Sequence, residues 1–142
     1  MDSILASAGA SLAGLPQFLA YLVAGIALVV IFVLLYSLLT PQHELTLIRR
    51  GNPAAATTLG GAVLGFAIPL SKSIQQSHDL VDMVVWATVA LVVQLAVFFL
   101  CGVLVAHETR KIENGDMATA GFLAFAAVAA GLITSASMSY SP

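Results

Sequence analysis

The sequence contains few charged residues and only one cysteine. Charged side chains make up 8% of its 142 residues, whereas roughly 25% is usual for soluble domains. Because nucleic-acid binding needs clustered Lys and Arg side chains, and only five are present, we exclude a nucleic-acid partner. The single cysteine, Cys101, excludes an intrachain disulfide and a zinc site held by cysteine ligands.

Sequence motifs for catalysis are absent as well. The sequence contains no phosphate-binding loop, no HExxH zinc motif and no nucleophile with a nearby base. We therefore expect a protein that is not an enzyme, with no catalytic residues, no cofactor and no metal.

The N-terminal segment lacks the basic region that opens a secretory signal peptide, so the hydrophobic segment that follows it is expected to be retained.

Long apolar segments are what the sequence has in abundance. Apolar residues make up 60% of the chain, and the mean hydropathy is +1.01. A helix needs about 20 apolar residues to cross the ~30 Å hydrocarbon layer of a bilayer, and four segments meet this length. Their continuous apolar character excludes the alternating pattern of outer-membrane strands. The sequence predicts one all-α integral membrane domain, residues 1–142, with four helices at about 18–39, 53–71, 82–105 and 117–136.

The positive charges predict how the helices are oriented. Arg49 and Arg50 lie in the first connection, and Arg110 and Lys111 lie in the third. The second connection contains only Lys72. Because connections rich in Lys and Arg stay in the cytoplasm, the first and third connections are predicted inside and both termini outside.

One polar segment occurs twice, 64 residues apart. Residues 43–52 read HELTLIRRGN, and residues 107–116 read HETRKIENGD. Six positions between 43 and 56 are identical to those at the offset of 64, and four of them lie within these segments. We therefore predict two tandem hairpin repeats, at about 18–71 and 82–136. Since each repeat holds two spans, the repeats have the same orientation and are related by an axis along the membrane normal.

The end of the repeated segment has the residues of a helix-to-helix turn. Gly51 and Gly115 are suited to the left-handed residue that ends a helix. Asn52 and Asp116 are suited to the N-cap of the next helix, and Pro53 to its first position. We expect equivalent turns before the second and fourth spans.

The beginning of the repeated segment carries the same pair of residues in both copies, at His43, Glu44, His107 and Glu108. These side chains are predicted to surround the cytoplasmic end of the helices. Three interpretations remain open: hydrogen bonds and ion pairs with loops and helix ends, an access path for cations or protons, or a metal site. Neighbouring helical residues point about 100° apart, which disfavours chelation by one His-Glu pair.

Three residues within the spans also stand out. Gly61 and Gly65 form a small-xxx-small pair, which predicts close packing against a helix of the same chain or of another subunit. Gln94 lies in the middle of an apolar span, where its amide needs a partner. It is either an interhelical hydrogen-bond donor or a polar station in a pathway.

Four stretches of the chain resemble those of a known family. They are the pattern E-x-x-L-I-x-x-G-N-x-A-A-A at Glu44–Ala56, the run GGAVLGFAIPLSKSI, residues 86–94 and the run IENGDMATA. Together they resemble the YjfL-like family of small bacterial inner-membrane proteins, and the resemblance covers about residues 40–142. The resemblance implies a helical fold in the inner membrane, and envelope-stress proteins as partners. The family has no assigned biochemical function, so the resemblance implies no catalytic or binding residues.

These features lead to two functional hypotheses. The first is a homo-oligomeric, non-enzymatic structural or interaction component of the cell envelope, since four short helices enclose little by themselves. The alternative is a subunit of a small ion or solute channel or transporter, with polar groups at its cytoplasmic mouth.

Overall fold

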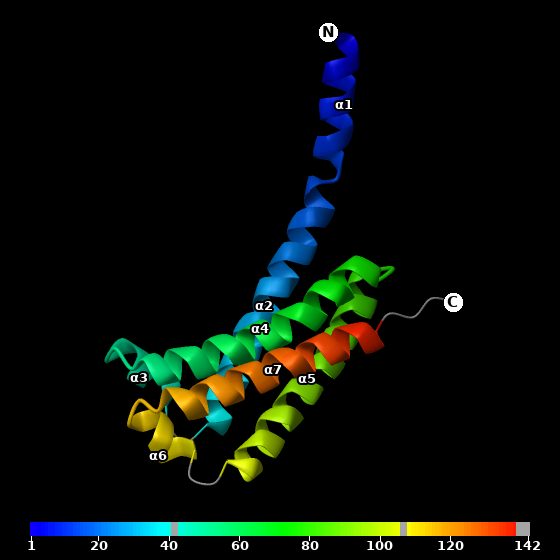
Figure 1. Cartoon of the computed structure of the whole chain (residues 1–142). Coiled ribbons are helices and arrows are strands. Elements are labelled where there is room, and N and C mark those ends of the chain that lie inside the picture. The colour runs from blue at the N-terminus through cyan, green and yellow to red at the C-terminus, as the bar shows by residue number, and fades with distance from the viewer. Residues whose placement is uncertain (41–42, 106–107, 139–142) are drawn as a thin grey trace.

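In the computed structural model, described over residues 1–40, 43–105 and 108–138, every regular element is an α-helix. Four helical segments, Ser3–Leu39, Pro53–Gln76, Leu80–Leu104 and Met117–Ser137, are long and apolar enough to cross a membrane. The predicted all-α membrane fold is confirmed. The helices in chain order are α1 (Asp2–Ala13), α2 (Leu15–Leu39), α3 (Glu44–Arg49), α4 (Pro53–Gln76), α5 (Leu80–Leu104), α6 (Glu108–Glu113) and α7 (Met117–Ser137) (Figure 1).

Helix α4 is the centre of the bundle. It packs along α7 and also contacts α2, α3 and α5 (Figure 1). Half of the most apolar 18-residue stretch of α4 is buried, compared with 17% of the corresponding stretch of Ser3–Leu39. The α4 stretch nevertheless has the lowest hydropathy of the four. The reason is that lipid already provides an apolar surrounding, so small residues that permit close helix contact, rather than the most hydrophobic ones, occupy the interior.

Large aromatic side chains fill the space between α2, α4 and α5. Phe32 of α2 stacks on Phe66 of α4 with ring centroids 4.8 Å apart. Tyr36 meets the edge of Phe98 of α5, also at 4.8 Å. Phe32, Tyr36 and Phe66 are at most 1% exposed, so these rings close the bundle interior.

The two short helices occupy one end of the bundle. Helix α3 begins at Glu44 and α6 at Glu108, 64 residues later, and the helices that follow begin at Pro53 and Met117, at the same offset. These helix starts follow the 64-residue offset of the repeated segment, and the tandem repeat itself stays a prediction. Superposition of the two halves and the orientation of the termini stay predictions.

The first helical segment extends well beyond the bundle. The sequence predicted a span from about residue 18, whereas the helix begins near residue 3 and continues to Leu39 with a small bend at Gly14. Side chains described before Tyr21 are exposed, and Tyr21 is the first to be partly covered. Helix α1 thus projects away from the other helices (Figure 1).

Candidate functional site

The connections that carry the repeated segment contain matching turns. Gly51 has φ +82° and Gly115 has φ +77°, a conformation that glycine adopts without steric cost. The Gly51 N–H donates to the Ile48 carbonyl at 2.9 Å, and the Gly115 N–H donates to the Ile112 carbonyl at 3.0 Å. Both glycines therefore end a short helix in the left-handed conformation that the sequence predicts.

Each glycine is followed by an N-cap residue. The Asn52 Oδ1 atom accepts a hydrogen bond from the Ala55 N–H at 3.1 Å, and Pro53 occupies the first helical position. The Asp116 carboxylate accepts the Thr119 hydroxyl at 2.9 Å and the Ala118 N–H at 3.0 Å. The hydrogen bond from the Thr119 hydroxyl is the main reason why the pKa of Asp116 lies below its ordinary value. Desolvation of the carboxylate acts in the opposite direction and raises this pKa.

The Asn52 amide also connects the two repeated segments. Its Nδ2 atom donates to the carbonyl oxygens of Ile112 at 2.9 Å and Glu113 at 3.2 Å, at the end of α6. These two carbonyls are among those that a helix end leaves without an intrahelical donor. The sequence identified Asn52 only as a cap, and no sequence signal marks the backbone carbonyls that its amide reaches.

The two residues of the first His-Glu pair lie in different surroundings. His43 is exposed and has a left-handed backbone, with φ 48°. Glu44 is fully buried, and its Oε1 atom accepts a 3.3 Å hydrogen bond from the Tyr36 hydroxyl. Of the second pair, His107 lies outside the described residues, and Glu108 is described only as the first residue of α6.

Tyr36 is a site residue that the sequence reasoning missed. It lies near the end of an apolar span, where a tyrosine commonly places its hydroxyl toward a polar partner, and this pattern could have identified it.

Within the described ranges, no group of three or more His, Cys, Asp or Glu side chains has the geometry of a metal site.

Gly61 and Gly65 lie where α4 meets α7. A Cβ atom on Gly61 would overlap with the backbone and side chain of Ala124, and one on Gly65 would lie 2.7 Å from the Ala127 carbonyl carbon. Gly131 of α7 is equally constrained, because its Cβ atom would lie 2.8 Å from the Gly65 carbonyl carbon. The contact is therefore within the chain, and Gly131 is a member that the sequence did not identify.

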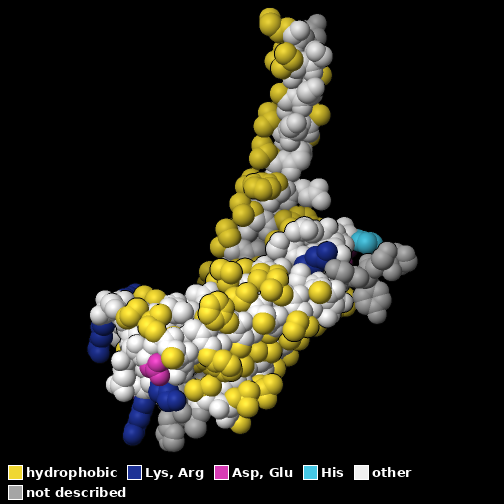
Figure 2. Space-filling view, in the orientation of Figure 1, with side chains coloured by type: hydrophobic (Ala, Val, Ile, Leu, Met, Phe, Trp, Pro, Cys, Tyr) yellow, Lys and Arg dark blue, Asp and Glu magenta, His cyan; other side chains and the backbone are white. Residues whose placement is uncertain are grey.

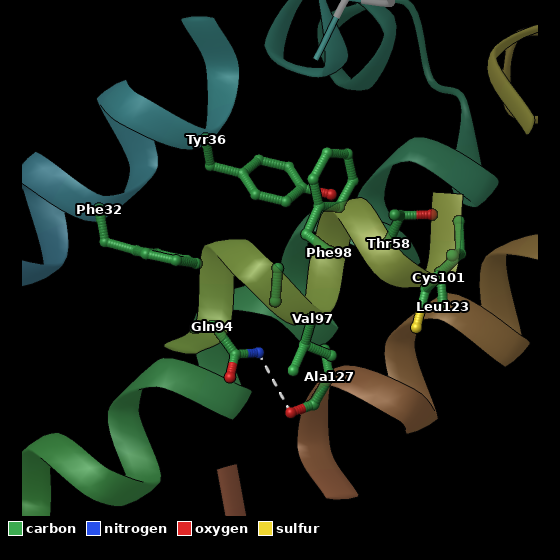
Figure 3. A pocket seen from close by; sticks show the side chains of 10 residues that line it. Phe32, Tyr36, Thr58, Gln94, Val97, Phe98, Cys101, Leu123 and Ala127 are labelled. Carbon is green, nitrogen blue, oxygen red and sulfur yellow. Dashed lines mark hydrogen bonds between the residues drawn. The ribbon is translucent and has the colours of Figure 1, made fainter. Parts of the chain in front are cut away.

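Gln94 lies at the same junction, 3% exposed. Its Nε2 atom donates to the Ala127 carbonyl at 3.1 Å, which joins α5 to α7 (Figure 3). A cavity beside it, toward Tyr36, Thr58 and Cys101, has a volume of about 20 Å³. Because one water needs about 10–15 Å³ by this measure, the cavity has room for about one water.

Comparisons with known proteins place the chain in a family. The family described as Domain of Unknown Function (DUF350) matches residues 10–138, and so includes the first span. The UPF0719 inner membrane protein YjfL of Escherichia coli strain K12 is 36% identical over 126 residues, which cover 89% of this chain and 96% of the relative.

A second relative comes from another bacterium. The UPF0719 transmembrane protein YshE of Bacillus subtilis strain 168 is 30% identical over 113 residues, covering 78% of this chain and 84% of the relative. No solved structure matches. With four membrane-spanning helical segments and relatives of this kind, the chain is a multi-pass inner membrane protein that belongs to the DUF350 family.

Proposed function

We propose that this protein is a non-enzymatic, homo-oligomeric structural or interaction component of the cell envelope. The observation that supports this proposal is the first helix, whose described side chains before Tyr21 are exposed. The segment Ser3–Leu39 has 37 residues, which gives a length of about 56 Å at ~1.5 Å per residue. The hydrocarbon layer is only ~30 Å thick, so about half of this helix extends beyond the bundle and the lipid tails.

The extended helix has one face of large apolar side chains and one face of small or polar ones. A period of 3.6 residues brings the large side chains together, and they are 42–71% exposed: Ile4, Leu5, Leu12, Leu15 and Leu19. Figure 2 shows hydrophobic side chains, with alanine included, in yellow mainly along one edge of the projecting helix. The opposite face consists of Ser3, Ala6, Ala10, Ala13 and Gln17.

A second copy of the chain fits these two faces. Small residues allow another helix to approach closely, and large apolar residues supply the contact surface. The large face of one copy can therefore pack on the small face of the next, a head-to-tail contact that forms a ring where its rotation closes. Envelope-stress proteins, the partners that the family resemblance implies, would contact an assembly of this kind.

The mass of the protein in detergent tests the proposal. We expect the wild-type protein to have a mass that is a multiple of 14.7 kDa by light scattering with detergent correction. The double variant Leu5→Gln/Leu12→Gln removes apolar contact from the large face, and Ala10→Trp blocks the small face. Both are expected to shift the protein to a single subunit.

Phe125→Gln is the matched control, since Phe125 is 77% exposed on α7 and lies away from the first helix. This variant is expected to keep the wild-type mass. A wild-type protein of 14.7 kDa, or variants in α1 that retain the wild-type mass, would rule out assembly through this helix.

A small channel is the second candidate function, and the cavity beside Gln94 is the observation that favours it. Its volume of about 20 Å³ holds about one water, whereas conduction needs polar groups along the whole membrane depth. The aromatic rings of Phe32, Tyr36 and Phe98 line this cavity. A pathway through one chain is therefore not expected.

We expect liposomes that contain the purified protein to show no flux of monovalent cations. Gln94→Leu removes one interhelical hydrogen bond, which costs about 0.6 kcal/mol on average in membrane proteins, so this variant should fold and assemble normally. Fluorescent indicators of potassium and proton flux provide the measurement. A robust flux that Gln94→Leu abolishes, in a variant of normal stability, would favour the channel over the structural component.

A further inference from the structure

An open pocket lies at the end of the bundle opposite α3 and α6. It is formed by the end of α4, the start of α5 and the end of α7, and its volume is about 390 Å³. Ligand pockets have volumes of about 300–1,000 Å³, so this one has the size for a small polar group. The lining residues that carry its chemistry are Gln76, Ser77, His78, Asp82 and Trp86.

The charge of the pocket favours a cation. Asp82 contributes a carboxylate, and neither Lys nor Arg is among the described residues that line the pocket. The nearby Lys72 lines a different groove. Asp79 caps α5 by accepting the Asp82 N–H at 2.8 Å, which adds a second negative charge at this helix end. An anionic ligand would therefore meet the Asp82 carboxylate in the pocket, with the Asp79 carboxylate close by at the same helix end.

Two further groups are suited to a cationic ligand with hydrogen-bond donors. The Ser77 Oγ atom is buried and has no hydrogen-bond partner in the part of the chain that the structure describes. Buried polar atoms are nearly always paired, so this oxygen is available to a ligand or a water. Trp86, which also lines the pocket, is 42% exposed, and an indole ring can attract a cation to its face.

We propose that this pocket binds the primary ammonium group of a phospholipid headgroup, that of an ethanolamine phospholipid. An ammonium group has three N–H donors, which match the Asp82 carboxylate, the Ser77 hydroxyl and the Gln76 amide oxygen. A quaternary ammonium has no N–H donor, and a glycerol headgroup has no positive charge. The pocket lies at the level of Trp86, and tryptophan is enriched at the depth of lipid headgroups.

Trp86 provides a direct signal for the test, because it is the only tryptophan of the chain. The purified full-length protein in maltoside micelles is titrated with dihexanoylphosphatidylethanolamine while the tryptophan emission is recorded. Parallel titrations use the phosphatidylcholine and phosphatidylglycerol lipids with the same chains. We expect a saturable change with the ethanolamine lipid, at an affinity at least tenfold above that for the other two.

Three variants connect the signal to the pocket. In the wild type, the backbone N–H of His78 donates to the Asp82 Oδ2 atom at 3.3 Å. Asp82→Asn removes the charge but keeps an oxygen that can accept this bond, and it is expected to weaken binding at least tenfold. Ser77→Ala is expected to weaken binding several-fold without lowering the unfolding temperature, since this hydroxyl has no hydrogen-bond partner among the described residues. Glu113→Gln, which removes a charge at the other end of the bundle, should leave the affinity unchanged.

The result that would overturn the proposal is equal affinity for the three lipids, or an Asp82→Asn variant that binds like the wild type. Ethanolamine hydrochloride serves as a soluble source of the same group. If it binds as tightly as the ethanolamine lipid, the pocket takes soluble amines and the lipid assignment is wrong. Because the test concerns neither α1 nor the subunit number, its outcome is independent of the proposed function.

Discussion

The variant Gly65→Leu is expected to lose the native bundle. The Cβ atom at this position would lie 2.7 Å from the Ala127 carbonyl carbon and would also overlap with the Gln94 amide. Overpacking a core typically costs about 1–3 kcal/mol, and here the obstacle is backbone of a neighbouring helix that cannot rotate away. We expect a loss at or above the upper end of this range, measured as thermal unfolding in detergent by circular dichroism.

Gly60 provides the matched control on the same helix. No described atom of residues 1–40, 43–105 or 108–138 lies within 4 Å of a Cβ atom at Gly60, and the residue is exposed. Gly60→Leu should therefore be neutral or slightly stabilising, because leucine favours the helix over glycine by several tenths of a kcal/mol. If Gly60→Leu and Gly65→Leu unfold at the same temperature, α4 and α7 do not form the close contact described above.

The variant Asn52→Ala is expected to be more harmful than the loss of a cap. A cap alone contributes about 1 kcal/mol, and each neutral hydrogen bond contributes about 0.5–1.5 kcal/mol. Asn52 makes one capping bond and two bonds to carbonyl oxygens of α6. We therefore expect a loss of about 2–4 kcal/mol in the free energy of unfolding, determined by chemical denaturation in mixed micelles.

The variant Asn52→Asp separates the two roles of this side chain. Aspartate caps a helix as well as asparagine does, so a residue that acts only as a cap would tolerate the change. The carboxylate lacks the two N–H donors and places a negative charge beside the carbonyl end of α6, so we expect a clear loss of stability. The reverse change at the equivalent position, Asp116→Asn, should have little effect. Wild-type stability of Asn52→Asp would argue against the bond between the two segments.

Much of the architecture was predictable from the sequence, because few choices exist in lipid. Backbone groups cannot remain unpaired in hydrocarbon, so each long apolar segment had to form a helix. The turns at Gly51 and Gly115 were predictable since they depend on local backbone conformation. The length of the first helix was underestimated because residues 3–17 are small and polar enough to resemble a tail, whereas their helix continues into the span.

The sequence by itself determined the helical class, the number of spans and the chemistry of the turns, since these depend on neighbouring residues. Only the tertiary structure decided that α4 is central, that Glu44 is buried against Tyr36, and that Gln94 donates to Ala127. In a membrane the outer and inner faces of a helix are both apolar, so no period of polarity marks the buried face. Contacts then depend on the fit of small residues and backbone carbonyls far apart in the chain, which become visible only when the helices are packed.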